Sequence, residues 1–149
     1  MQTFKHGTAK VLCLARGGVT YARVSGLVMG ATAGVVISSI AGLSSAEEAT
    51  GQVVVYDAPV LLAPDSLFAV AKSGGGSLPT ALVVGPDQID MFRAYSRLAM
   101  QAGILKAVFL TETLAFEWVA QAALVHAYQL SHAAPGQSRP TNSRKANYA

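Results

Sequence analysis

The central part of the chain alternates between short apolar runs and longer mixed segments. Three runs, Gln52–Asp57, Thr80–Gly85 and Lys106–Leu110, are rich in β-branched or aromatic residues and are bounded by Pro, Gly, Asp or Thr. Runs of this kind are typical of buried strands. The segments between them are long enough for the crossover that parallel pairing requires. The pattern therefore predicts an α/β unit of three strands and three helices from Gln52 to Trp118.

Helical spacing and capping residues define the helices of this unit. Pro86 and Asp87 are expected to open a helix that ends just before Gly103. Its buried stripe consists of Ile89, Phe92, Tyr95, Leu98, Ala99 and Ala102. Arg93 and Arg97 lie one turn apart on the other side and are interpreted as a solvated face.

Two further helices are predicted from capping residues. Asp65 and Ser66 are good N-caps for a short helix over Leu67–Lys72, and Thr111 or Thr113 caps the last helix.

The N-terminal region predicts a hairpin followed by a helical segment. Lys10–Ala15 is an expected strand, and Phe4 begins a strand before it, with a turn over His6–Thr8. Thr20 is then expected to cap a segment whose apolar positions are Val24, Leu27, Val28, Ala31, Val35 and Ile40.

The stretch Ser25–Ala46 carries no charged residue and has more than one interpretation. Gly26, Gly30 and Gly34 recur at four-residue spacing, as in packed membrane helices, and the stretch is long enough to span a bilayer. The alternative is one or two buried helices, or a helix and a strand, packed on the sheet. Hydroxyl residues dilute its hydrophobicity and favour the buried alternative; these are Thr32, Ser38, Ser39, Ser44 and Ser45.

Composition indicates one apolar domain with a basic tail. Of 149 residues, 52% are hydrophobic and 13% are charged, which suggests a sheet covered on both faces or a buried partner surface. The net charge of +3 belongs to the tail, which contributes Arg139, Arg144 and Lys145. We therefore expect a single domain over residues 1–132, a disordered basic tail over 133–149, and no specific binding of nucleic acid.

The single cysteine, Cys13, excludes an internal disulfide and any multi-cysteine metal site. Its apolar neighbours indicate a buried thiol. Because the N-terminus has no apolar run of signal-peptide type, a reducing cytoplasm is the expected location. No motif for a cofactor, a metal or a catalytic residue is found.

The stretch Val53–Ala122 resembles the STAS domains, named for sulfate transporters and anti-sigma-factor antagonists, including the SpoIIAA-like bacterial proteins. The similarity lies in a strand ending at Asp57, a few apolar residues, the pair Asp65-Ser66, and a second strand ending at Gly85-Pro86. The resemblance implies a four- to five-stranded mixed, mainly parallel sheet flanked by helices.

The resemblance also implies a candidate phosphoacceptor. Anti-sigma-factor antagonists carry a phosphorylated serine directly after the Asp, and the matching residue is Ser66. Leu67 and Phe68 stand where the family has a small residue and a glycine. The alternative is that Asp65 and Ser66 only cap a helix.

We expect a non-enzymatic regulatory or scaffolding module that binds a protein partner through a helix–loop surface over Pro59–Lys72, and that self-associates. The contact residues expected there are Val60, Leu61, Leu62, Asp65 and Ser66. One alternative is a protein that binds lipid or another apolar ligand, or contacts a membrane. Another is an enzyme that uses the strand-end carboxylates of Asp57, Asp65 and Asp87.

Overall fold

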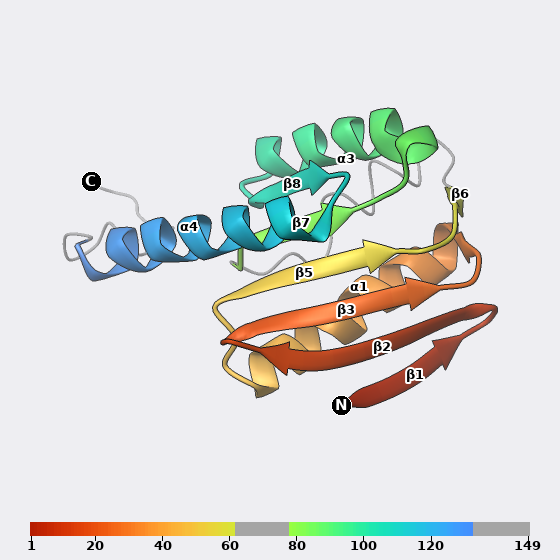
Figure 1. Cartoon of the computed structure of the whole chain (residues 1–149), viewed down its shortest axis with the longest axis horizontal. Coiled ribbons are helices and arrows are strands. Elements are labelled where there is room, and N and C mark those ends of the chain that lie inside the picture. Colours follow the sequence, from red (N-terminus) through yellow and green to blue (C-terminus); the bar gives the residue numbers. More distant parts are fainter. Residues whose placement is uncertain (62–77, 133–149) are drawn as a thin grey trace, which may run out of the picture.

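The computed structural model describes residues 1–61 and 78–132. These residues form a mixed sheet with helices on both faces (Figure 1). The elements are β1 (Gln2–His6), β2 (Ala9–Arg16), β3 (Val19–Ser25), β4 (Val28–Met29), α1 (Gly30–Ala46), β5 (Gly51–Tyr56), β6 (Val60–Leu61), β7 (Thr80–Val83), η1 (Pro86–Gln88), α3 (Ile89–Gln101), β8 (Lys106–Phe109) and α4 (Glu112–Ser131).

The main sheet has six strands in the order β1-β2-β3-β5-β7-β8. The first three strands pair antiparallel, and β3, β5, β7 and β8 pair parallel. The α/β class and the mainly parallel sheet predicted from the sequence are thus confirmed, with a sheet slightly larger than expected. A separate two-stranded ladder joins β4 to β6.

The strand order explains how the helices are distributed. Each parallel strand adds to the outer edge of the one before it, and right-handed crossovers then place their helices on one face. α1 and α3 accordingly share one core, which includes Val36, Ile40, Phe92 and Tyr95. α4 follows the last strand and covers the opposite face, where Ala115 and Val119 pack on Val53 and Ala81.

α4 sits unusually close to the start of β5. Gly51 has no side chain, and a Cβ built there would lie 2.6 Å from Cγ1 of Val119 and 3.3 Å from the carbonyl oxygen of Pro79. Glycine at position 51 therefore permits the close approach of α4 to the sheet.

The helix expected from Thr20 is wrong, because Val19–Ser25 is the strand β3. Its residues alternate, with Thr20, Ala22 and Val24 toward α1 and the others toward α4. Pairing on both sides, with β2 and β5, favours the extended form over any local helical tendency. Gly26, at φ 81°, ends the strand.

The uncharged stretch contains the end of β3, the short β4 and the buried helix α1. Gly34 has open space where its side chain would be, so it does not serve a close helix contact. Among the helices of the described residues, none is both long and apolar enough to cross a bilayer.

The other elements expected within the described residues are confirmed. The hairpin turn, the three central strands and the helix between Pro86 and Gly103 all form. Thr111 is the N-cap of α4, and its Oγ1 accepts a hydrogen bond from the Leu114 amide at 3.4 Å. Leu67–Lys72 and the tail lie outside the described residues.

Candidate functional site

A pocket lies at the C-terminal ends of the parallel strands, where open α/β sheets bind ligands. Its volume is about 380 Å³. It is lined by Arg23, Val55, Tyr56, Asp57, Ala58, Pro59, Val83, Val84, Gly85, Asp87, Gln88, Leu110 and Glu112. Strands β3, β5 and β7, the segment after β8 and the first turn of α4 thus all contribute to it.

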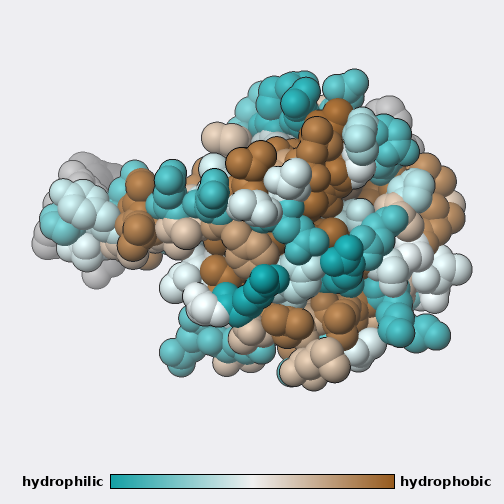
Figure 2. All heavy atoms as spheres, viewed as in Figure 1, coloured by the Kyte–Doolittle hydropathy of each residue, from teal (hydrophilic) through white to brown (hydrophobic). Residues whose placement is uncertain are grey.

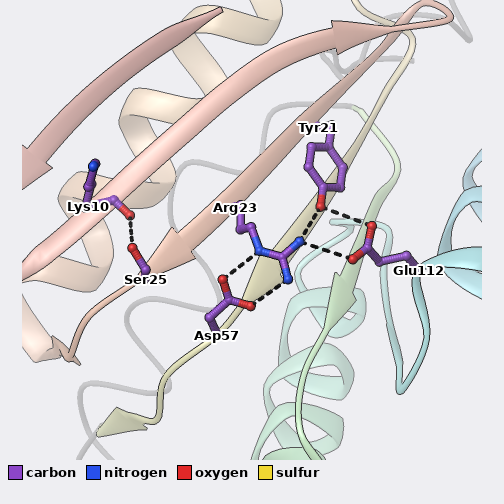
Figure 3. A network of polar contacts seen from close by, with 6 residues as sticks. All are labelled: Lys10, Tyr21, Arg23, Ser25, Asp57 and Glu112. Atoms are coloured by element: carbon purple, nitrogen blue, oxygen red, sulfur yellow. Dashed lines mark hydrogen bonds and ion pairs between the residues drawn. The ribbon is translucent and has the colours of Figure 1, made fainter.

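A polar network centred on Arg23 forms one wall of the pocket (Figure 3). The Arg23 guanidinium donates to both carboxylate oxygens of Asp57, from Nε at 2.7 Å and from Nη2 at 3.0 Å. Its Nη1 donates to the Tyr21 hydroxyl at 2.9 Å and to Glu112 at 3.3 Å. The Tyr21 hydroxyl in turn donates to Glu112 at 3.0 Å.

Register and chain direction assemble this network. Arg23 and Asp57 come from adjacent parallel strands, and the Asp57 amide continues the ladder by donating to the Val24 carbonyl at 2.8 Å. Glu112 arrives on the first turn of α4, where a carboxylate is favourable beside the helix N-terminus. The hydrogen bond to Asp57 is the main cause that raises the pKa of Arg23. Burial, and then the bond to Glu112, raise the pKa of the Tyr21 hydroxyl.

The charges of the pocket do not balance. Arg23 contributes one positive charge, whereas Asp57, Asp87 and Glu112 contribute three negative charges. In the described part of the chain, Asp87 forms no ion pair. The described lining of the pocket therefore has a net negative charge. Asp87 is the carboxylate of the lining that lies outside the Arg23 network.

Beside the pocket lies an exposed apolar pair, Met29 and Leu61. The parallel ladder of β4 and β6 places these two residues opposite each other, and they are 54% and 51% exposed. The preceding pair, Val28 and Val60, is buried and anchors the ladder in the core. The Val60 amide also donates to the side-chain carbonyl of Gln88 at 2.8 Å, which ties β6 to the pocket rim.

The expected contact residues therefore differ in accessibility. Leu61 is at the surface, whereas Val60 is 3% exposed and packs inward. Leu62, Asp65 and Ser66 lie outside the described residues, so their positions relative to Leu61 are not described.

Of the expected strand-end carboxylates, the fold brings Asp57 and Asp87 to one pocket. Asp65 lies outside the described residues. Within residues 1–61 and 78–132, no three His, Cys, Asp or Glu side chains are grouped so that they could hold a metal ion.

Sequence reasoning missed Arg23 and Glu112. The segment predicted as a helix from Thr20 includes Arg23, and Glu112, between the two capping candidates Thr111 and Thr113, has no predicted role. The alternation of β-branched and aromatic residues over Val19–Val24 is the signal that points to a strand there.

A second polar cluster is buried beneath α1 and α3. The ammonium group of Lys106, 4% exposed, donates to the Tyr95 hydroxyl at 2.6 Å. Loss of hydration lowers the pKa of Lys106 to about 8, and burial raises the pKa of Tyr56 to about 12. The adjoining cavity, of about 20 Å³, has room for one water molecule.

Comparison of the chain with protein-family models, with curated proteins and with solved structures finds no match. The class that the fold defines is an α/β protein with a mixed, mainly parallel sheet.

Proposed function

We propose that this protein is a non-enzymatic regulatory or scaffolding module that binds a protein partner at the strand-end surface centred on Leu61. The observation that carries the proposal is the exposed pair of Met29 and Leu61. Both are large apolar side chains, and the β4–β6 ladder places them opposite each other beside the charged pocket. Apolar anchors next to polar groups are typical of protein interfaces.

The rigidity of the pair supports this proposal. Val28 and Val60 fix the ladder from below, and the bond from the Val60 amide to Gln88 fixes it from the side. A preorganised surface loses little conformational entropy when a partner binds. The negative pocket at its edge favours a partner whose apolar contact is flanked by a basic group.

The proposal extends the STAS resemblance. The order of the described elements from β5 to α4 supports a SpoIIAA-like module. We propose the cytoplasm as its location. In such a module Ser66 is the candidate phosphoacceptor, and a phosphate there would add negative charge to the chain five residues after Leu61.

The test is affinity capture of the tagged protein and three variants from its own cells. Leu61→Asp and Met29→Asp place a charge in the proposed contact, and Met100→Asp is the control, because Met100 is 56% exposed on α3. We expect the partner to be retained by the wild type and by Met100→Asp, and to fall at least about tenfold with the other two. Equal capture by all four folded proteins would refute the surface. The same mass spectra report phosphate on Ser66.

Self-association is a second part of the proposal. The C-terminal half of α4 extends beyond the sheet (Figure 1) and exposes Leu124, Val125, Tyr128 and Leu130 at 55–72%. Figure 2 shows hydrophobic residues along this projecting segment. Light scattering on the wild type and on Leu124→Glu would detect a dimer that the variant loses. A monomeric wild type at high concentration would refute it.

A small-molecule site or an enzyme is the second candidate, because Asp57 and Asp87 line one pocket. Calorimetric titration with magnesium, manganese and zinc tests its metal-dependent form. Binding that Asp87→Asn abolishes would favour this candidate over the partner-binding module.

A further inference from the structure

On the face that α4 occupies, the described residues leave the β1–β2 hairpin open. α1 and α3 lie on the other face, and α4, the one described helix on this side, packs on β5, β7 and β8. Figure 1 shows no helix in front of β1, β2 and β3. Val19 and Tyr21 of β3 are nevertheless buried in the core beneath α4. The open area, which we call the hairpin face, therefore consists of β1 and β2 with Arg23 at its edge.

The hairpin face is basic. Residues 1–46 contain Lys5, Lys10, Arg16 and Arg23 and no Asp or Glu. Side chains alternate between the two faces along a strand, and the residues next to these four in sequence point toward α1. The four basic side chains therefore point to the hairpin face. Figure 2, drawn from this side, shows hydrophilic residues interspersed with apolar ones over this part of the sheet.

Three of these four positive charges have no ion-pair partner among the described residues. Arg23 is neutralised by Asp57 and Glu112, but within residues 1–61 and 78–132 no carboxylate lies within ion-pair distance of the other three. Lys5 and Lys10 are moreover direct cross-strand partners. Like charges in this arrangement destabilise a sheet, so an anionic group that bound between them would relieve the repulsion.

The face also has an apolar stripe. Leu12 and Leu14 are partly exposed on β2, between the basic residues. Arg16 is held at one end of the stripe, with its guanidinium 4.8 Å from the ring centre of Phe116. The two open strands, about 4.8 Å apart, lie beside α4, and a helix on them would pack about 10 Å from its neighbour.

We propose that the hairpin face binds an acidic amphipathic helix of another protein, beside α4. The apolar side of that helix would lie on Leu12 and Leu14, and its carboxylates would reach Lys5, Lys10 and Arg16. This surface is separate from the Leu61 surface, and the proposal does not depend on it.

The basic charge of the hairpin face favours an acidic helix of another protein over a second copy of this chain or a nucleic acid. The described helices of this chain lack a free acidic face, because α1 has no charge, α3 has two arginines against Asp90, and the acids of α4 lie in its sheet-packed first half. A second copy thus offers no complement among them. Single-stranded nucleic acid favours exposed aromatic rings for stacking, and the tyrosine of this face, Tyr21, is 7% exposed.

The test uses the full chain and a synthetic helical peptide of about five turns. The peptide carries leucines on one side and glutamates along both flanks, and a matched peptide has lysine for each glutamate. Binding is measured by fluorescence anisotropy at low and high salt. We expect the acidic peptide to bind, with an affinity that falls as salt rises, and the basic peptide not to bind.

The paired variants locate the site. Lys5→Glu/Lys10→Glu should weaken binding at least about tenfold, whereas Arg93→Glu/Arg97→Glu, with the same change in charge on α3, should bind like the wild type. Leu12→Asp should also weaken binding. Equal weakening by both charge variants would overturn the proposal, as would no binding of the acidic peptide. Tighter binding of an oligonucleotide or of anionic vesicles would assign the face to another occupant.

Discussion

Lys106 donates a hydrogen bond to the hydroxyl of Tyr95 across 2.6 Å in the interior of the protein. No described carboxylate lies within ion-pair distance of this ammonium group. A buried charge whose described partners are neutral destabilises the folded state unless it gives up its proton.

The first prediction is that alkali stabilises the fold through Lys106. Its pKa is lowered from 10.5 to about 8 in the folded state, so between these values the unfolded chain binds more protons and stability rises with pH. The gain approaches about 1.4 kcal/mol per pH unit inside this window. Urea unfolding from pH 7 to 10 measures it.

The wild type also contains groups whose ionisation lowers the stability of the fold as pH rises. Cys13 and Tyr56 have raised pKa values of about 11 and 12, and they lower stability as pH rises through their unfolded values of 9.0 and 10.0. Lys106→Met isolates the lysine, because the wild type should gain stability relative to this variant as pH rises from 7 to 10. Lys5→Met removes an exposed lysine as a control. A difference independent of pH would contradict the prediction.

The second prediction concerns the contact of Gly51 with Val119. Gly51→Ala should destabilise the protein by about 1–3 kcal/mol, because the new methyl group would overlap Val119. Val119→Ala should cost less in the Gly51→Ala background than in the wild type, since it removes that overlap. Thermal and urea unfolding of the four proteins give the coupling energy.

Gly34→Ala is the matched control for this pair. Position 34 lies inside α1 with nothing near the added methyl group. Alanine should therefore stabilise the helix by about 0.5–1 kcal/mol. Similar losses at positions 34 and 51 would exclude the steric explanation.

The third prediction is that Cys13 reacts slowly with thiol reagents. It is 4% exposed, and burial, with a smaller contribution from Glu47, raises its pKa to about 11. Two pKa units reduce the reactive thiolate about a hundredfold below its ordinary fraction. Labelling at pH 8, followed by absorbance, should be slow in buffer and rapid in urea. Full labelling of the native protein within seconds would show that the strand opens readily.

The fourth prediction is a measurable coupling between Arg23 and Asp57. Because this bidentate ion pair is partly exposed, we expect a coupling energy of about 0.5–1 kcal/mol from a double-mutant cycle of Arg23→Met and Asp57→Asn. Salt should reduce it. The control cycle, Asp90→Asn with Arg97→Met, joins two residues two turns apart on α3 that form no described ion pair, and it should give a value near zero.

The sequence identifies those parts of the fold that local pattern determines. β5, β7 and β8 are buried apolar runs between clear turn residues, and α3 has a regular apolar stripe and a glycine after its end. Sequence reasoning missed β3, because its alternating pattern is partly polar and the strand is stabilised by pairing with β2 and β5.

The candidate site was only half accessible to sequence reasoning. Asp57 and Asp87 follow recognisable strands, so their common edge follows from parallel pairing. Arg23 and Glu112 are separated by 89 positions, and their contact depends on where α4 lies across the sheet. No periodicity along the chain encodes that placement.

The strand order β1-β2-β3-β5-β7-β8 has a consequence for how the protein is made. Every strand joins an edge that the preceding part of the chain has already formed, so no strand has to be inserted between two that are already paired. During synthesis, the segment through Tyr56 already contains β1, β2, β3 and β5, which pair with one another in that order. The sheet can therefore grow one strand at a time as the chain leaves the ribosome, and α4 packs on its part of the second face last.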